Sequence, residues 1–522
     1  MQQLRDILED PSDNFPIGVE LVSTRGTTEE LKAVKARDFS MELAHTDAVD
    51  WVSITDNAGG NPMLAPAALG KTLLEEQKPV AIHLSCKDFN RNGLESVAWQ
   101  LNSEGFHNIL ALSGDSPIDG HEGQAKPVFD IDSVGLLTML SEMNQGMRVK
   151  GPGNKIRQLG VTRFFSGAVV NNFKCHENEV VPQYLKLDKK IECGAKYIIN
   201  QIGFDARKIH ELLCYMRRRK NTHIPMVGNV YVLSGFVARL FHSRKIPGVY
   251  VNDDLLALAT EQSKSPDKGR AFFLEFAAKQ LAIYRGLGYK AGYLGGVHSY
   301  RAVQEILGIE KSFAADDWKQ FAKELNFCHP QEFYMFDEDK ETGLSTMDLE
   351  PDFAASLETR PRKSASYTLS KVFHSLMFTK GKGIEPLCTR LVANSKDPDQ
   401  GPWWMRKMEH VSKSILFSCR DCGDCSLPET AFLCPESQCA KNQRNGPCGG
   451  TRDGLCEVND NRCIWARAYD RLKCDGTQLD LLAHDPTLQD QSLRYTSGWA
   501  NCWLEKDHIA KKKELKQKQP TT

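Results

Sequence analysis

The chain has 522 residues, with 66 Lys and Arg against 67 Asp and Glu, a net charge of −1 and 16 cysteines. At roughly 100 to 200 residues per domain, this length suggests two or three domains, unless one α/β barrel of roughly 250 residues takes up half of it. The near-neutral charge argues against a nucleic-acid-binding protein. No apolar stretch approaches the ~20 residues that a membrane-spanning helix needs. The polar, acid-rich N-terminus lacks a signal-peptide pattern, so we expect a cytoplasmic protein.

Short apolar runs rich in β-branched residues alternate with helical segments from residue 15 to about residue 300. The segments 27–37, 93–104 and 271–287 have the character of helices, and 271–287 repeats apolar residues every three or four positions. Eight strands that alternate with helices predict a (β/α)8 barrel of the α/β class. We predict the strands at 17–21, 51–55, 80–85, 109–112, 164–170, 197–202, 224–230 and 290–294.

The rest of the chain divides into two further regions. Residues 311–410 carry helical patches, such as 316–325 and 371–378, joined by polar connectors. Residues 411–522 hold most of the cysteines and end in a lysine-rich tail, which we expect to be a solvated helix end. We therefore predict a barrel over 1–310, a mostly helical connector over 311–410 and a cysteine-rich metal-binding domain over 411–522.

Polar residues follow most of the predicted strands, where barrels of this kind gather their chemistry. For most of them, a role in starting a loop is the simpler interpretation. Glu20 differs, because it lies within an apolar strand (IGVELV), where an unpaired charge is costly. We expect that this carboxyl group has a partner or holds a proton, as a general acid must. The residues at the strand ends are Glu20, Thr55, His83, Ser85, Gly114, Asp115, Asn171 and Gln201.

Five collinear segments resemble the barrel of methylenetetrahydrofolate reductases. They are residues 17–20 (IGVE), 52–55 (VSIT), 81–88 (AIHLSCKD), 110–117 (LALSGDSP) and 200–205 (NQIGFD). The resemblance implies a flavoenzyme that moves a hydride between reduced flavin and the one-carbon unit of methylenetetrahydrofolate. By position, Glu20 matches the general acid that protonates the folate N10. Asp115 matches the acid near the flavin and the pterin, and Gln201 a folate-binding glutamine.

The resemblance also implies a flavin-binding surface, with FAD as the expected cofactor and FMN as the alternative. The sequence departs from the family pattern in the loop after the fifth strand, and lysines replace the usual Asn/Arg pair on the following helix. Lysine meets a phosphate as a point charge, without the bidentate geometry of arginine. The cofactor-binding positions are Thr55, His83, Ser85, Gly114, Asp115, Ala168, Asn171, Lys186, Lys189 and Lys190.

Half of the cysteines lie between residues 419 and 463, and in a reducing compartment they favour metal binding over disulfides. Three of them follow a Cys-x2-Cys-x2-Cys pattern, and a distant Cys-Pro comes after it. Spacing alone leaves iron–sulfur clusters and zinc both open. The candidate ligands are Cys419, Cys422, Cys425, Cys434, Cys439, Cys448, Cys456 and Cys463.

The cysteine segment resembles the C-terminal domain associated with methylenetetrahydrofolate reductases, which in acetogen-type enzymes belongs to a separate iron–sulfur partner subunit. The segments that carry this resemblance are 419–425 (CRDCGDC), 441–450 (KNQRNGPCGG), 456–458 (CEV) and 463–469 (CIWARAY). It implies 4Fe-4S clusters, with zinc as the alternative, that connect the flavin to ferredoxin in place of or beside NAD(P)H.

We therefore expect an oxidoreductase that interconverts 5,10-methylenetetrahydrofolate and 5-methyltetrahydrofolate in one-carbon metabolism and methionine biosynthesis, with a homo-oligomer as one possible assembly. Three alternatives stay open. The barrel could oxidise methyltetrahydrofolate in a demethylation pathway. It could be a folate-dependent methyltransferase with a structural zinc domain. It could also be a degenerate barrel whose zinc module serves in assembly.

Overall fold

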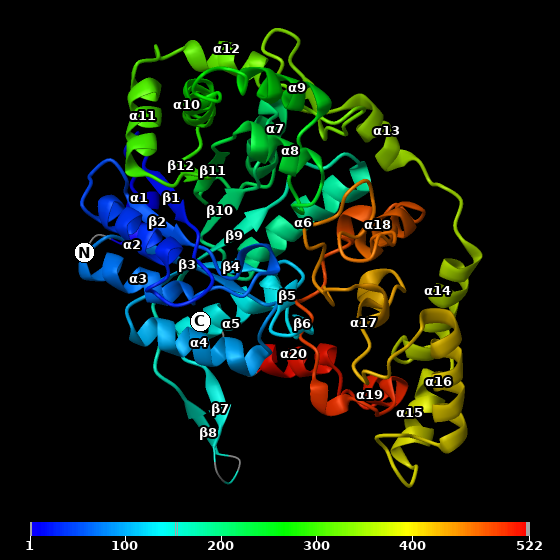
Figure 1. Cartoon of the computed structure of the whole chain (residues 1–522). Helices are drawn as coiled ribbons and strands as arrows, with labels where there is room; N and C mark the ends of the chain where they lie inside the picture. Colours follow the sequence, from blue (N-terminus) through cyan, green and yellow to red (C-terminus); the bar gives the residue numbers. More distant parts are fainter. Residues whose placement is uncertain (1–2, 152, 154, 518–522) are drawn as a thin grey trace.

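A closed barrel of parallel strands forms the centre of the molecule in the computed structural model, which describes residues 3–151, 153 and 155–517 (Figure 1). Within these residues, eight strands close the barrel, and each overlaps one of the predicted strands. The predicted (β/α)8 fold is therefore confirmed. In order around the barrel, the strands are β1 (Ile17–Leu21), β2 (Trp51–Ile54), β3 (Val80–Ser85), β4 (Asn108–Leu112), β9 (Phe165–Val170), β10 (Tyr197–Asn200), β11 (Met226–Tyr231) and β12 (Ala291–Gly295).

Large aromatic side chains fill the inside of the barrel, among them Trp51 and Tyr197. Glycines on neighbouring strands make room for them: a Cβ atom on Gly18 would lie 2.2 Å from the Trp51 ring, and one on Gly167 would lie 2.2 Å from the Tyr197 ring. The short helix α1 (Leu4–Leu8) packs its apolar side chains against this cluster. The C-terminal ends of the strands remain for chemistry, as in other barrels of this kind.

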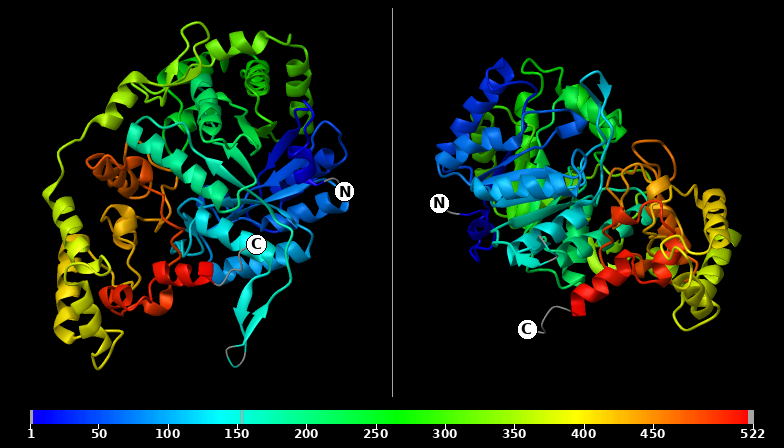
Figure 2. Two further views of the ribbon diagram at one scale, coloured as in Figure 1. Left: turned by 180° about the vertical axis from the view of Figure 1, so that it is seen from behind. Right: turned by 90° about the horizontal axis from the view of Figure 1, so that it is seen from below.

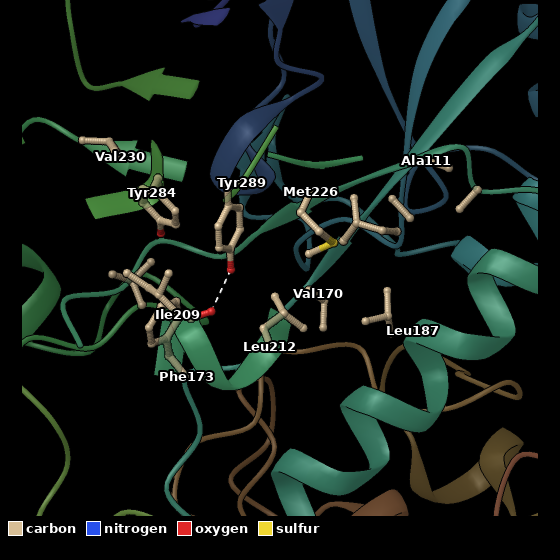
Figure 3. Close-up of a cluster of buried hydrophobic side chains, with 14 of the residues drawn as sticks. Ala111, Val170, Phe173, Leu187, Ile209, Leu212, Met226, Val230, Tyr284 and Tyr289 are labelled. Atoms are coloured by element: carbon tan, nitrogen blue, oxygen red, sulfur yellow. Dashed lines mark hydrogen bonds between the residues drawn. The ribbon is translucent and has the colours of Figure 1, made fainter. Parts of the chain in front are cut away.

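Helices surround the barrel, and an apolar layer between helices and strands forms the main core. Figure 3 shows part of this layer, where Leu187 and Leu212 lie near Val170 and the Tyr289 hydroxyl donates to the Ile209 carbonyl over 2.9 Å. The helices are α2 (Leu31–Ala44), α3 (Pro66–Glu75), α4 (Arg91–Ser103), α5 (Ser133–Gln145), α6 (Glu177–Glu192), α7 (Ala206–Arg218), α8 (Gly235–His242), α9 (Asp253–Gln262), α10 (Arg270–Leu287) and α11 (Tyr300–Lys311).

The connector runs from the barrel along the outside of the molecule (Figure 1). Its helices are α12 (Asp317–Glu324), α13 (Pro351–Glu358), α14 (Ala365–Phe378), α15 (Glu385–Ala393) and α16 (Trp403–Phe417). Between α12 and α13 lies an antiparallel hairpin, β13 (Phe336–Glu338) and β14 (Ser345–Leu349), which the sequence pattern did not predict. Ser345 donates from its hydroxyl to the Arg207 carbonyl over 3.4 Å, so the hairpin is fastened to α7.

The cysteine-rich region packs against the barrel rather than forming a separate lobe (Figures 1 and 2). It is largely irregular, with the helices α17 (Pro435–Gln438), α18 (Ile464–Lys473), α19 (Gly498–Trp503) and α20 (His508–Gln517). The Tyr469 hydroxyl of α18 donates to Glu177 of α6 over 2.7 Å, and Lys473 pairs with the same carboxylate. We call residues 419–503 the module below.

The basic tail begins as a helix, since α20 contains Lys511, Lys512 and Lys513. Lys511 pairs with Asp490, and Lys512 donates to the Pro486 carbonyl, so the start of the helix is tied to the module. Lys518 lies outside the described residues. Among the helices that the structure describes, none has the length and apolar character needed to cross a membrane.

Candidate active site and metal centres

Glu20 is half-buried at the C-terminal end of β1 and has a hydrogen-bond partner. The Tyr293 hydroxyl of β12 donates to Glu20 Oε2 over 3.2 Å. Burial raises the pKa of Glu20, and this hydrogen bond offsets part of the rise. Glu20 thus has both features expected of it: a partner, and a carboxyl group that keeps its proton to higher pH than a free glutamic acid.

A chain of hydroxyl groups continues from Glu20 across the barrel. Ser53 of β2 hydrogen-bonds to the Tyr293 hydroxyl, and its Oγ lies 2.7 Å from His83 Nε2 of β3. The parallel register places these side chains together, because Glu20 pairs with Ser53 between β1 and β2. Burial lowers the pKa of His83 to about 4, so its imidazole is neutral at neutral pH. The arrangement orients Glu20 without placing a second charge next to it.

Thr55 and Ser85, both expected to line a flavin, lie at the ends of β2 and β3. The Thr55 side chain is buried, and its Oγ1 has no hydrogen-bond partner in the described part of the chain. Buried hydroxyl groups are normally paired, so Thr55 fits a site that a ligand completes. Ser85 differs, because its Oγ donates to Asp56 Oδ2 over 2.6 Å.

Asp115 lies on the rim of the barrel after β4. Its Oδ2 accepts a hydrogen bond from the Gly59 backbone N–H over 3.1 Å. The neighbouring Gly114 carbonyl accepts from Lys441 Nζ over 2.8 Å, and Lys441 is also paired with Glu457. The rim at Asp115 is therefore shared between the barrel and the module.

The predicted residues after β9 and β10 also meet the module or its surroundings. Asn171 Nδ2 donates to the carbonyls of Gly248 and Gly449, over 3.1 and 2.9 Å. Gln201 Oε1 accepts from the Ile202 backbone N–H over 2.9 Å. Ala168 differs, because its side chain is part of the hydrophobic core. A cofactor would reach Ala168 through its backbone.

The three lysines proposed to face a cofactor are buried on α6 and point at backbone carbonyls. Lys186 Nζ donates to the carbonyls of Gly446 and Pro447, over 3.1 and 3.0 Å. Lys189 Nζ donates to the His484 carbonyl over 2.6 Å, and Lys190 Nζ to a carbonyl of β9 over 2.5 Å. Burial lowers the pKa of Lys189 to about 8 and that of Lys190 to about 7. The geometry lends no support to phosphate contacts here, and that role stays a prediction.

The eight cysteines of the module separate into two groups of four among the described residues. In the first, which we call the outer group, burial raises the pKa of Cys419, Cys422 and Cys425, and neighbouring thiols of the same group raise it further. The fourth member is Cys434, whose negative charge as a thiolate raises the pKa of the other three. The outer group therefore consists of consecutive cysteines.

The remaining four line one cavity and form the inner group: Cys439, Cys448, Cys456 and Cys463. Helix α17 lies between the groups, with Cys434 before it and Cys439 after it. At 1.5 Å per residue, their Cα atoms are about 8 Å apart. The inner group is beside the barrel, because the segment that reaches from Lys441 to Thr451 contacts the ends of β4 and β9.

The spacing of the sulfurs bears on which metal each group suits. No three of these eight sulfurs lie within 4.8 Å of one another in the part of the chain that the structure describes, and all of these cysteines are free. A tetrahedral Zn²⁺ with Zn–S bonds of about 2.3 Å requires sulfurs about 3.8 Å apart. The cysteines of a four-iron cluster bind four different irons and stand farther apart. Backbone N–H groups also point at the sulfurs, as Gln443 N does at Cys439 Sγ over 3.4 Å.

Comparison with known proteins agrees with this architecture. The family model described as methylenetetrahydrofolate reductase matches residues 5–283, which is more than half of the chain. The chain belongs to the methylenetetrahydrofolate reductase family. A second model, described as methylene-tetrahydrofolate reductase C terminal, matches residues 403–491, which are α16 and most of the module.

One relative of this methylenetetrahydrofolate reductase family member comes from yeast. Methylenetetrahydrofolate reductase 2 of Schizosaccharomyces pombe is 22% identical over 188 residues, which are 35% of this chain and 28% of that protein. The alignment thus spans less than a third of that relative.

Two solved structures resemble part of the chain at low similarity. A protein from Clostridium thermocellum that binds two copies of 5-methyl-5,6,7,8-tetrahydrofolic acid has a TM-score of 0.40 at 13% identity, over 59% of this chain and 96% of that one. Dihydropteroate synthase of Xanthomonas albilineans has a TM-score of 0.33 at 12% identity, over 57% and 92%. Neither likeness bears on function.

Sequence reasoning missed two parts of the site. Tyr293 and Ser53 lie inside predicted strands, where an isolated tyrosine or serine reads as a core residue. The contacts of Lys441 and Gly449 with the barrel join positions 327 and 278 residues apart in the chain. The glycine-rich run around them was the available signal, since Gly446 and Gly449 have positive φ angles and let the backbone approach α6 and Asn171 closely.

Proposed function

We propose that this protein is a flavin-dependent oxidoreductase that interconverts 5,10-methylenetetrahydrofolate and 5-methyltetrahydrofolate, with iron–sulfur clusters in the module. The observation that carries the proposal is Glu20, half-buried at the mouth of the barrel, with a raised pKa and a hydrogen bond from Tyr293. The match to the methylenetetrahydrofolate reductase family model supports a folate substrate and a flavin.

In this proposal Glu20 acts as the general acid. A protonated Glu20 delivers its proton to N10 of the folate, which opens the five-membered ring and makes the one-carbon unit electrophilic. Tyr293 holds the carboxyl group in position, and Ser53 with neutral His83 fixes the tyrosine hydroxyl. In the reverse direction Glu20 takes the proton back, so the same groups serve both directions.

The residues at the mouth fit a flavin in part. The unpartnered Thr55 Oγ1 and the neutral His83 would face it, whereas Lys186, Lys189 and Lys190 are engaged by carbonyl groups of the backbone. When bound, a flavin supplies the hydride chemistry that amino-acid side chains lack. Asp115 and Gln201 lie on the rim, where a pterin would meet them.

The two cysteine groups fit iron–sulfur clusters better than zinc, because no three of their sulfurs lie within 4.8 Å of one another in the described part of the chain, and because two of the sulfurs receive backbone N–H donors. The outer group would hold one cluster and the inner group a second one, next to the mouth of the barrel. Clusters there would supply one-electron chemistry, which suits a carrier such as ferredoxin.

The test is the Glu20→Gln variant in anaerobically purified full-length protein. We expect turnover of methylenetetrahydrofolate to fall at least 100-fold, because the proton donor is lost while the shape is kept, with the flavin absorbance unchanged. Glu9→Gln is the matched control, since Glu9 follows α1, away from the mouth. Full activity of Glu20→Gln would overturn the assignment. Purified protein that is colourless and contains no iron would overturn the assignment of a flavin and iron–sulfur clusters.

A further inference from the structure

Three metal-ligating side chains that the proposed function does not use meet between the barrel, the connector and the module. The ligand atoms of Cys175, His329 and Asp453 all lie within 4.8 Å of one another. Cys175 belongs to the loop between β9 and α6, His329 to the loop between α12 and β13, and Asp453 to the module. Among the described residues, this group alone has such a spacing, which the eight cysteines of the module lack.

The surroundings hold these side chains in place. The Tyr250 ring stacks on His329 with ring centroids 3.4 Å apart. The His329 backbone N–H donates to Glu332 Oε2 over 2.6 Å, and the Phe333 backbone N–H donates to the Cys175 carbonyl over 2.9 Å. Asp453 is oriented by an ion pair with Arg244. Neighbouring residues thus hold Cys175 and His329, and an ion pair at the surface orients the exposed Asp453.

An unpaired carboxylate borders the same space. The group lines a cavity of about 90 Å³ together with Glu179, whose side chain is buried at 3% exposure. Neither carboxylate oxygen of Glu179 has a hydrogen-bond partner within the described residues. A buried carboxylate without a partner is costly. Lys174 also lines the cavity, and the charge of Glu179 acts on it, but its Nζ donates to the Thr451 carbonyl and not to Glu179. A metal cation in the cavity would give Glu179 the direct partner that Lys174 does not provide.

We propose that Cys175, His329 and Asp453 bind one zinc ion, with the fourth position open to water or Glu179. One thiolate, one imidazole and one carboxylate form a borderline donor set that suits Zn²⁺, and a spacing within 4.8 Å suits a single ion. Binding replaces the S–H bond of Cys175 with an S–Zn bond and releases the proton to solvent. No electron is transferred.

The ion would act as a clamp. Its ligands come from three segments that are far apart in the chain, so it fixes the module and the connector to the loop after β9. The site shares no residue with Glu20 or with either cysteine group, although Asp453 lines a cavity together with Cys463 of the inner group. It therefore stands or falls independently of the folate chemistry.

The experiment uses the full-length protein with its clusters intact, stripped of loosely bound metal with a chelator and titrated with Zn²⁺. We expect the wild type to bind one equivalent more than Cys175→Ser or Asp453→Asn, with equal iron content in all three. Zn²⁺ should raise the thermal midpoint of the wild type by several degrees and leave that of both variants unchanged, because only the native wild type binds the ion.

Cys193→Ser is the matched control, because Cys193 is a partly buried cysteine outside every group described here. It should keep the extra equivalent. Circular dichroism checks that each variant is folded, and exposed Asp453 is the substitution least able to disturb folding. Equal zinc binding by the wild type and folded Asp453→Asn, or loss of the equivalent in Cys193→Ser, would overturn the proposal. Substitution with Co²⁺ should give a spectrum of one thiolate ligand, and a four-thiolate spectrum would contradict it.

Discussion

Glu20 combines two opposing influences on one proton. Burial disfavours the charged carboxylate and raises the pKa, whereas the hydrogen bond from Tyr293 favours the carboxylate and lowers it. The balance leaves a pKa above the ordinary value of glutamic acid. A general acid must be protonated to work, so activity depends on which influence dominates.

Removing the tyrosine hydroxyl should shift this balance. In Tyr293→Phe we expect the pKa of Glu20 to rise further, because the variant loses the hydrogen bond that stabilises the carboxylate. The protonated acid then persists to higher pH, so the alkaline fall in kcat/KM for the folate moves upward. A pH profile of kcat/KM measures the shift.

Tyr231→Phe is the control. The charge of Glu20 raises the pKa of Tyr231, but the hydrogen bond to Glu20 comes from Tyr293. Its pH profile should match that of the wild type. An unchanged profile in Tyr293→Phe would remove Tyr293 from the site.

At the scale of elements, helix α5 begins at the junction of barrel and module. Asp132 caps the helix by accepting from the backbone N–H groups of Val134 and Gly135. The same carboxylate accepts from the backbone N–H and the side-chain Nδ2 of Asn445, over 2.9 and 3.1 Å. One carboxylate thus stabilises a barrel helix and holds the module against it.

We expect Asp132→Ala to lower the free energy of unfolding by about 3 kcal/mol, about 1 from the cap and the rest from the buried donors of Asn445 left without a partner. Urea unfolding measures the loss. Ser299→Ala removes a comparable cap from α11, away from the module, and should cost about 1 kcal/mol. Equal losses in the two variants would show that the contact with Asn445 contributes nothing.

The contribution of Asp132 should also depend on pH. Burial would raise the pKa of Asp132, but Lys186, the Gly135 N–H and Asn445 together lower it. Stability from a lowered carboxyl pKa is fully present above the unfolded value of about 4 and is lost as the pH falls through the folded value. The difference between wild type and Asp132→Ala should therefore become smaller in acid, to the part that a neutral carboxyl group still provides as an acceptor.

Helix α17 separates the two cysteine groups, which gives a second prediction at this scale. Cys434→Ser should remove the iron of the outer group alone, and Cys456→Ser that of the inner group alone, so each variant keeps about half of the iron. Iron analysis and electron paramagnetic resonance of the reduced protein measure this. Loss of all the iron in either variant would mean that the grouping is wrong.

The elements differ in how far the sequence could predict them. The barrel strands were recognisable because they are buried on both sides and therefore read as continuous apolar runs. Hairpin β13–β14 was missed because β13 has three residues, too few for a period of two to stand out. Glu20 was recognisable as a charge in an apolar run, but the contact of Lys186 with Gly446 joins residues 260 positions apart and leaves no local pattern.

At the scale of the whole molecule, one exposed segment between α13 and α14 joins the barrel and hairpin β13–β14 to the helices and the module that follow. Residues 358–366 are solvent-exposed, and Lys363 within them pairs with Asp475 of the module. We expect brief trypsin treatment to cut after Arg362 or Lys363, giving fragments of about residues 1–363 and 364–522. The fragments should stay together at neutral pH, because the module is held by Asp132, Lys186 and Lys189.

Size-exclusion chromatography of the cut protein, followed by denaturing electrophoresis, measures this association. The two fragments should elute in one peak of native size. Separate peaks would show that the module and the barrel depend on the covalent link, and would support an independent domain over 411–522.

The contact of Lys441 with the rim of the barrel also sets an order of events during synthesis. About 150 residues separate the last barrel strand, β12, from Lys441. At 5–20 residues per second, the ribosome needs about 7 to 30 seconds to make them. During that interval the strand ends at β4 and β9 are complete but uncovered. A ligand that is present during translation therefore meets a rim without its contacts to Lys441 and Gly449, which is more open than the rim of the finished protein.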